Sequence, residues 1–217
     1  MHRVVTIDGP AGAGKSTVAR LLAGRLGWRF LDTGAMYRVV TLAALRGGVD
    51  LEDAGALDRL AGGLDASFPP GLAVLNGEDV SAAIRDVAVT RASRFIADCA
   101  AVRDRLVAWQ RAFAESDDVV TEGRDQGTIV FPDAFRKFFV TASEVERARR
   151  RHRELVAKGQ DVTLDAVLDD QRARDARDAS RAIAPMRAAD DAETVDTTGL
   201  SIDDVVDLLI RKVLSAP

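Results

Sequence analysis

Residues 9–16 of the chain, Gly-Pro-Ala-Gly-Ala-Gly-Lys-Ser, fit the pattern G-x-x-x-x-G-K-[ST] of a phosphate-binding loop, the P-loop. The apolar, β-branched run 3–7 before it predicts a buried strand, and apolar residues at helical spacing after it predict a helix beginning near Lys15. Glycines suit this loop because backbone N–H groups can point at a phosphate only where no side chain blocks the approach. The alternative, a glycine-rich turn that fits by accident, is disfavoured because both flanking elements are predicted.

The loop and the helix after it predict which residues would hold a nucleoside triphosphate. Lys15 would reach the β- and γ-phosphates, the Ser16 hydroxyl would ligate Mg²⁺, and the helix N-terminus would add partial positive charge. A guanine-reading N-K-x-D motif is absent, since Asn76 is the only asparagine and no lysine follows it. The sequence therefore favours an ATPase or a small-molecule kinase over a GTPase. The predicted triphosphate-binding residues are Gly9, Pro10, Ala11, Gly12, Ala13, Gly14, Lys15, Ser16 and Thr17.

The length and composition of the chain further limit its possible fold, partners and location. At 217 residues with 47% hydrophobic residues, the chain suits one α/β domain with insertions. The net charge of −4 argues against a general nucleic-acid binder. Cys99 is the only cysteine, which excludes an internal disulfide and a cysteine metal cluster and favours a packing role. No signal-peptide pattern and no membrane-spanning apolar run are found, so we expect the reducing cytoplasm as the location and no membrane partner. We also expect a monomer without a nucleic-acid partner.

Strand and helix patterns alternate along the chain. This alternation predicts an α/β fold with a five-stranded parallel sheet and helices on both faces, plus a small inserted β unit with a hairpin at Asn76-Gly77. Ligands are expected at the carboxyl ends of the strands, where the P-loop, Asp32-Thr33 and Arg124-Asp125 fall. The other predicted strands are 28–31, 119–121, 137–140 and 193–196, and the other predicted helices are 36–45, 51–60, 87–99, 102–113, 164–177 and 202–214.

Several longer motifs are more specific than the P-loop and span nearly the whole chain. With these motifs the chain resembles the bacterial cytidylate kinases of the nucleoside monophosphate kinase family. The resemblance implies transfer of phosphate from ATP to CMP or dCMP, an adenylate-kinase-like core, and a mobile lid that carries arginines. It implies one kinase domain over 1–217, with an acceptor-binding segment over about 33–98, a helical lid over about 147–180, and the core elsewhere. The motifs are Ile7-Asp8-Gly9-Pro10, 31–38 (LDTGAMYR), 110–113 (QRAF), 122–134 (EGRDQGTIVFPDA), 174–178 (RDARD), 181–185 and 196–198.

The segment Asp32-Thr33-Gly34 precedes a predicted helix and can be read physically. A hydroxyl and backbone N–H groups at a helix start can hold an anion, and Arg38 one turn later could bind the same anion bidentately. The plain alternative is an ordinary N-cap and a surface arginine. By resemblance, the acceptor nucleotide is bound here by Asp32, Thr33, Tyr37 and Arg38.

Two further sets of polar residues are assigned to the acceptor. Arg124 would bind its phosphate, and Asp125 would accept a hydrogen bond from the cytosine amine and reject uracil, although a structural salt bridge is the plain alternative. The residues 174, 177, 178 and 181 share one helical face, a pattern also typical of a solvated helix. The resemblance places Ser93 and Arg103 around the base, Arg174 and Asp178 near the sugar, and Arg181 at the phosphate.

A basic helix is predicted after Ser143, where Ser143 and Glu146 would form a capping box, and residues 157–161 interrupt it. Its arginines could form an exposed basic face or a lid over the transferring phosphoryl group. Arg147, Arg150 and Arg151 are the candidates, and the predicted catalytic set is Lys15, Arg124, Arg181 and Arg151. Kinases for UMP, AMP or a shikimate-like acceptor stay open as alternatives, as does a non-catalytic nucleotide-binding regulator.

Overall fold

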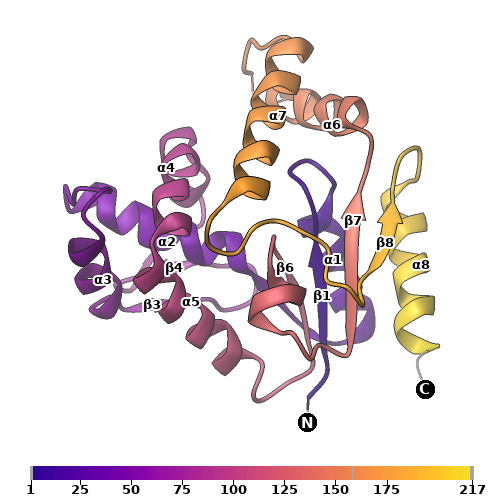
Figure 1. Cartoon of the computed structure of the whole chain (residues 1–217), viewed down its shortest axis with the longest axis horizontal. Helices are drawn as coiled ribbons and strands as arrows, with labels where there is room; N and C mark the ends of the chain where they lie inside the picture. The colour runs from indigo at the N-terminus through magenta and orange to yellow at the C-terminus, as the bar shows by residue number, and fades with distance from the viewer. Residues whose placement is uncertain (1, 158, 216–217) are drawn as a thin grey trace. The chain divides into compact units, whose positions relative to one another are not determined.

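The computed structural model describes residues 2–157 and 159–215 (Figure 1). The chain divides into two compact units. The larger unit comprises Met1–Phe30 and Asp117–Pro217, and the smaller unit comprises Leu31–Ser116. Among the residues that the structure describes, no helix combines the length and the apolar character that crossing a membrane requires.

A five-stranded sheet has the order β2-β6-β1-β7-β8, so strands distant in the sequence are neighbours. The pairs β1–β6, β1–β7 and β7–β8 are parallel. This topology confirms the predicted parallel sheet, and it brings the carboxyl end of β6 beside that of β1, where the P-loop begins. The strands are β1 (Val4–Asp8), β2 (Arg29–Asp32), β6 (Val119–Glu122), β7 (Arg136–Thr141) and β8 (Glu193–Asp196).

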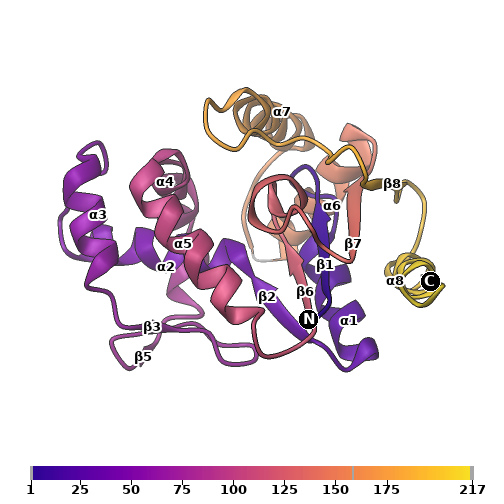
Figure 2. The same ribbon diagram turned by 60° about the horizontal axis from the view of Figure 1, so that its bottom comes forward.

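One face of this sheet forms the main hydrophobic core. Helix α1 (Lys15–Leu26) and helix α8 (Ile202–Leu214) pack there, on the same side of the sheet (Figure 2). Alternate residues of β1, Val5 and Ile7, point into this core because side chains alternate between the faces of a strand. The same alternation turns Thr6 and Asp8 toward the opposite face, where β1 meets the segment after β6.

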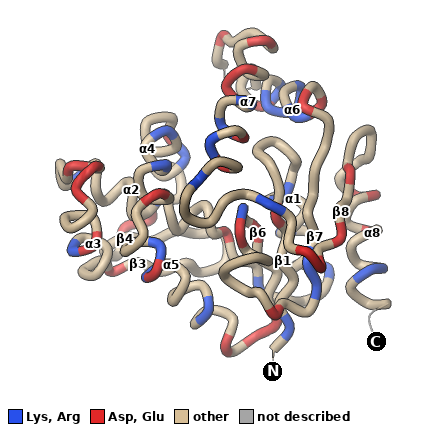
Figure 3. The backbone as a smooth tube through the Cα atoms, in the orientation of Figure 1, with Lys and Arg blue, Asp and Glu red and all other residues tan. Residues whose placement is uncertain are grey.

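That segment, η2 (Gln126–Val130), is one turn of π-helix, which the sequence analysis does not predict. Two helices follow β7: α6 (Glu144–Ala157) and α7 (Leu164–Ser180). The predicted interruption at 157–161 lies between them, with Lys158 outside the described residues. Both helices carry acidic and basic residues, and arginines predominate in α6 (Figure 3).

The start of α6 corrects one prediction. Ser143 caps the helix, since its Oγ accepts a hydrogen bond from the Glu146 N–H at 3.3 Å. The reciprocal half of the predicted capping box is replaced, because the Ser143 N–H donates to Thr198 Oγ1 and the Glu146 carboxylate accepts from Arg150. A true capping box occurs instead at α8, where Ser201 and Asp204 satisfy each other.

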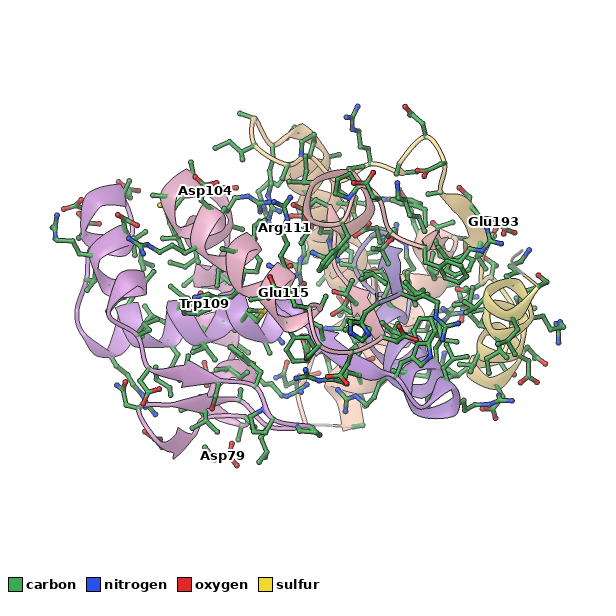
Figure 4. The ribbon with its side chains drawn as sticks, turned by 90° about the horizontal axis from the view of Figure 1, so that it is seen from below. Asp79, Asp104, Trp109, Arg111, Glu115 and Glu193 are labelled. Carbon is green, nitrogen blue, oxygen red and sulfur yellow. The ribbon has the colours of Figure 1, made fainter. Side chains whose placement is uncertain are left out.

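The smaller unit packs helices around a three-stranded antiparallel sheet of order β3-β4-β5. The predicted hairpin is confirmed, since Asn76 and Gly77 both have positive φ, as a tight two-residue turn requires. Asp79 lies exposed on the edge strand (Figure 4), whereas Cys99 is buried and free, as predicted. The elements are α2 (Thr33–Arg46), α3 (Ala54–Gly62), β3 (Ala66–Ser67), β4 (Val74–Leu75), β5 (Glu78–Asp79), η1 (Ala83–Arg85), α4 (Val87–Asp98) and α5 (Ala100–Phe113).

Candidate nucleotide-binding site

The predicted P-loop connects β1 to α1 in the larger unit. Gly9, Gly12 and Gly14 all have positive φ, the backbone region that a side chain disfavours. Gly14 is the N-cap of α1, and it provides no side chain to accept hydrogen bonds from the first turn. The N-terminus of this helix therefore keeps the backbone character that suits an anion.

Lys15 begins α1 and is 5% exposed. Its Nζ donates a hydrogen bond to the carbonyl oxygen of Pro10 at 2.8 Å, within the loop itself. Burial, followed by the charge of Arg124, lowers the pKa of Lys15, whereas the charge of Glu122 opposes this shift. A desolvated cation held against its own loop has much to gain from a polyphosphate, because the phosphate would replace missing solvation.

Ser16 shows a partner that the sequence analysis missed. Its Oγ donates to Glu122 Oε1 at 2.9 Å, and Glu122 is the last residue of β6. Hydroxyl and carboxylate oxygens are the ligands that Mg²⁺ prefers, usually one or two of them together with phosphate oxygens and water. The donor set therefore fits Mg²⁺ in a nucleotide complex. No cluster of three or more His, Cys, Asp or Glu side chains suited to a metal is found in the described part of the chain.

Asp8, at the end of β1, was also given no role from the sequence. Its two carboxylate oxygens accept the N–H groups of Gln126 and Gly127 at 2.9 and 2.7 Å. Burial raises the pKa of Asp8 to about 6, although these two N–H groups and Lys15 act in the other direction. Asp8 thereby fixes the start of η2, the segment that directly follows Arg124 and Asp125.

Three predicted acceptor residues form one cluster in the larger unit. Arg124 Nε donates to Asp178 Oδ2 at 2.9 Å, and Arg181 Nη2 lies 2.7 Å from Asp178 Oδ1. Burial alone would raise the pKa of Asp178, but Arg124 and Arg181 hold it below its usual value, and Arg174 contributes in the same direction. Asp178 is thus a buried carboxylate between two partly exposed guanidinium groups, whereas Arg177 on the same helical face is exposed. The solvated-helix alternative therefore applies to only part of this face.

The predicted base-reading residue, Asp125, is buried and is the N-cap of η2. Its carbonyl oxygen accepts hydrogen bonds from the N–H groups of Ile129 and Val130. The Thr121 hydroxyl holds the Gln126 side chain at 3.0 Å. Backbone and neighbours therefore restrain the segment that carries Asp125, as a specificity residue requires.

The three lid arginines differ in surroundings. Arg147 is buried and bonds the P-loop carbonyl of Ala11 at 2.9 Å. Arg150 bonds Thr197 through Oγ1 and the carbonyl oxygen, and its Nη1 would lie 3.9 Å from a Cβ placed on Gly14. The predicted catalytic residue Arg151 is 41% exposed and pairs with Glu154 on its own helix.

In the smaller unit, Asp32 is the N-cap of α2, and its Oδ1 accepts the Ala35 N–H at 2.8 Å. The Arg38 guanidinium lies above this helix start, where a Cβ on Gly34 would come within 2.8 Å of Nη1. Its contact with Asp32 is long, 3.5 Å, and its buried Nε has no hydrogen-bond partner among the described residues. A guanidinium held loosely, with a buried donor to satisfy, fits an incoming phosphate. Thr33, the first residue of α2, is buried beside them.

The other predicted acceptor residues of this unit lie on three helices. The Arg103 guanidinium of α5 lies 5.8 Å from the ring centroid of Tyr37 on α2. The Ser93 hydroxyl of α4 donates to the Thr90 carbonyl on its own helix at 2.8 Å. Tyr37 and Arg103 are therefore brought together, whereas the Ser93 hydroxyl bonds within its own helix.

Comparison with known proteins decides the family. A sequence model of the family described as Cytidylate kinase matches residues 5–215. The chain belongs to the cytidylate kinase family. It is 50% identical over 216 residues to the cytidylate kinase of Pseudomonas savastanoi pv. phaseolicola, covering 97% of this chain and 94% of that protein. It is also 50% identical over 214 residues to the cytidylate kinase of Pseudomonas aeruginosa, covering 96% and 93%.

The fold of this cytidylate kinase family member also occurs in a more distant solved structure. A gluconokinase from Sinorhizobium meliloti 1021 matches with a TM-score of 0.52 at 15% identity, covering 98% of this chain and 91% of that one. At this identity the likeness concerns the fold. It agrees with the predicted α/β kinase architecture around a parallel sheet.

Proposed function

We propose that this chain transfers the γ-phosphoryl group of ATP to CMP, giving ADP and CDP, and that dCMP is a second acceptor. Membership of the cytidylate kinase family carries the proposal. The site agrees with it, because cations gather around the P-loop: Lys15 is buried, and the charges of the partly exposed Arg124 and Arg174 add to burial in lowering its pKa. Bringing two polyanions together requires such a concentration of positive charge.

On the donor side, the P-loop residues Gly9–Thr17 would wrap the ATP phosphates. Lys15 would exchange its bond to the Pro10 carbonyl for the β- and γ-phosphate oxygens. Ser16 would hold Mg²⁺, with Glu122 orienting the hydroxyl. When bound, Mg²⁺ neutralises charge that develops on the phosphate oxygens.

On the acceptor side, the proposal assigns roles within each unit separately. In the larger unit, Arg124 and Arg181 would bind the CMP phosphate, Arg174 and Asp178 would contact the sugar, and Asp125 would accept the cytosine amine. Asp178 holds Arg124 and Arg181 in place before any nucleotide arrives. In the smaller unit, the phosphate would be bound by Thr33, Tyr37 and Arg38, and the base would be contacted by Ser93 and Arg103. Asp32, which caps α2, would contact the acceptor from the same helix start.

The reaction needs no general base from the protein. The nucleophile is an oxygen of the CMP phosphate, whose second pKa is about 6, so it is mostly dianionic at neutral pH. The two histidines are engaged elsewhere: His2 lies 4.0 Å from Asp118, and His152 bonds the Val162 carbonyl. The protein contributes positioning and charge neutralisation, and a lid would exclude water to prevent ATP hydrolysis. Arg151 remains the predicted lid residue at the transferring phosphoryl group.

Initial rates of ADP release with CMP, dCMP, UMP and AMP test the function directly. We expect CMP and dCMP to be used far better than UMP, because Asp125 repels the uracil carbonyl. We also expect little use of AMP. Asp125→Asn should narrow the ratio of CMP to UMP kcat/KM by about tenfold or more. Absence of turnover with any acceptor would reject the kinase and leave a nucleotide-binding regulator.

We further propose that the chain acts as a monomer in the cytoplasm and binds no nucleic acid. The net charge of −4 and the single buried cysteine support this proposal. Light scattering at working concentration tests whether the chain is a monomer. RNA binding with a steep salt dependence would contradict the proposal that the chain binds no nucleic acid.

A further inference from the structure

Both backbone polar groups of one P-loop residue, Ala11, are bonded by an ion pair between α6 and α7. Arg147 Nη1 donates to the Ala11 carbonyl oxygen at 2.9 Å, and the Ala11 N–H donates to Asp175 Oδ1 at 3.1 Å. The same Arg147 nitrogen lies 2.5 Å from Asp175 Oδ2. Arg147 is anchored in turn, because its Nε donates to the Ala142 carbonyl at 3.1 Å. The N–H and the carbonyl oxygen of Ala11 are thus bonded by the side chains of Asp175 and Arg147, which also form an ion pair with each other.

Gln171 of α7 supports this arrangement beside Gly12, the residue that follows Ala11 in the P-loop. Its Nε2 donates to the Arg147 carbonyl at 3.3 Å, which joins the two helices. A Cβ on Gly12 would lie 2.5 Å from that nitrogen and 3.1 Å from the same carbonyl. The P-loop and the two helices therefore lie close together at residue 12, where the φ of +75° favours glycine and a Cβ would crowd the Arg147 carbonyl.

The location of this ion pair points to positioning. The side chains of Arg147 and Asp175 are 7% and 17% exposed, and a pair this buried adds little net stability compared with apolar side chains of similar size. Its distinctive feature is that two of its bonds end on the loop backbone. A second pair, Glu144–Arg172, joins the same two helices at 2.9 Å but is more than half exposed.

We propose that Arg147 and Asp175 are positioning residues that clamp the P-loop at Ala11 in the shape that binds the donor triphosphate. The inference rests on the proposed function and deepens it, since it assigns to both residues a role toward the donor that the proposed function does not give them. The Arg147 charge also neutralises Asp175, so the carboxylate can hold the loop without repelling phosphate. Without the clamp, the loop would become ordered only when ATP binds, and this entropic cost would lower the affinity for ATP.

The test is the double variant Arg147→Met/Asp175→Leu, which removes both charges together and so leaves no isolated buried ion. Its matched control is Glu144→Leu/Arg172→Met, which removes the exposed pair between the same helices. ATP affinity is measured by calorimetry without CMP, and KM is then measured for ATP and for CMP. We expect the dissociation constant and KM of ATP to rise about tenfold in the clamp variant, with KM for CMP unchanged and the control like the parent chain.

A second variant covers failure of the first to fold. Asp175→Asn keeps an acceptor for the Ala11 N–H but removes the charge facing Arg147, and we expect about a threefold loss of ATP affinity. Folded clamp variants that bind ATP as tightly as the control would overturn the inference. The titration with ATP needs no acceptor, so it tests the clamp independently of the kinase reaction. A chain that fails to phosphorylate CMP would reject the proposed function, and the ATP affinities of the variants would still show whether the clamp exists.

Discussion

Strands β1 and β2 each end in an aspartate and lead toward a helix, yet these two aspartates act differently. Asp32 ends β2 and caps α2 directly, with its carboxylate on the Ala35 N–H. Asp8 ends β1 but turns away from α1 to accept the N–H groups of Gln126 and Gly127 in η2. Helix α1 then starts at Gly14 without any side-chain cap.

Two helix starts in one chain can thus be suited to anions in different ways. At α1 the backbone itself is available to a ligand, because the nearby carboxylate is occupied elsewhere and glycine supplies no acceptor. At α2 the helix start already holds a carboxylate, so an acceptor phosphate there would depend on the Arg38 guanidinium to outweigh repulsion by Asp32.

Lys15→Ala should give the largest effect. It removes the only lysine side chain of the P-loop, and loss of one charge-stabilising group in a buried site lowers kcat by about 10²- to 10³-fold. Because Lys15 is a desolvated cation, the variant should stay folded, which circular dichroism and a thermal melt can check. Lys212→Ala, which removes the partner of Glu193 on β8, serves as control. Full turnover by Lys15→Ala would mean that α1 does not bind the donor as proposed.

Arg38→Ala tests the other helix start. We expect KM for CMP to rise about tenfold or more and kcat to fall, since a bidentate guanidinium–phosphate pair is lost. Arg46→Ala on the same helix, which breaks a surface pair with Glu78, should leave both constants unchanged. Arg124→Ala should resemble Arg38→Ala in its kinetics. Near-normal CMP kinetics in both would remove these arginines from the acceptor site.

The sequence predicts the fold well because its signals are local. Strand and helix periodicity gives the parallel sheet, and the Asn76-Gly77 pair gives the hairpin. The missed features are contacts between segments far apart in the chain, such as Ser16 with Glu122, 106 residues apart. The π-helical turn η2 is missed for the same reason, since its start depends on a carboxylate 118 residues earlier. The roles of the predicted site residues remain proposals, because no local pattern distinguishes a ligand-binding arginine from a structural one.

Asp32→Ala separates capping from acceptor binding. Loss of an N-cap costs about 1 kcal/mol of unfolding free energy, measured by denaturant titration. Asp53→Ala is the matched control, because Asp53 caps α3 in the same way through the Ala56 N–H at 2.9 Å. Both variants should lose similar stability, and only Asp32→Ala should change KM for CMP. An unchanged KM would leave Asp32 with its cap alone.

The smallest effect concerns Asp8 and pH. Its pKa of about 6 in the folded chain lies above the ordinary value near 3.9, so between those values the folded state binds more protons than the unfolded state. Stability contributed by this group is therefore greatest below pH 4, declines as pH rises toward 6 and is lost above it, a change of about 1 kcal/mol between pH 5 and pH 7. Asp8→Asn cannot titrate, so the difference in unfolding free energy between parent and variant should show this decline. A difference that stays constant from pH 5 to pH 7 would mean that Asp8 is no more difficult to ionise than an exposed aspartate, and the contrast with Asp32 would then reduce to hydrogen bonding.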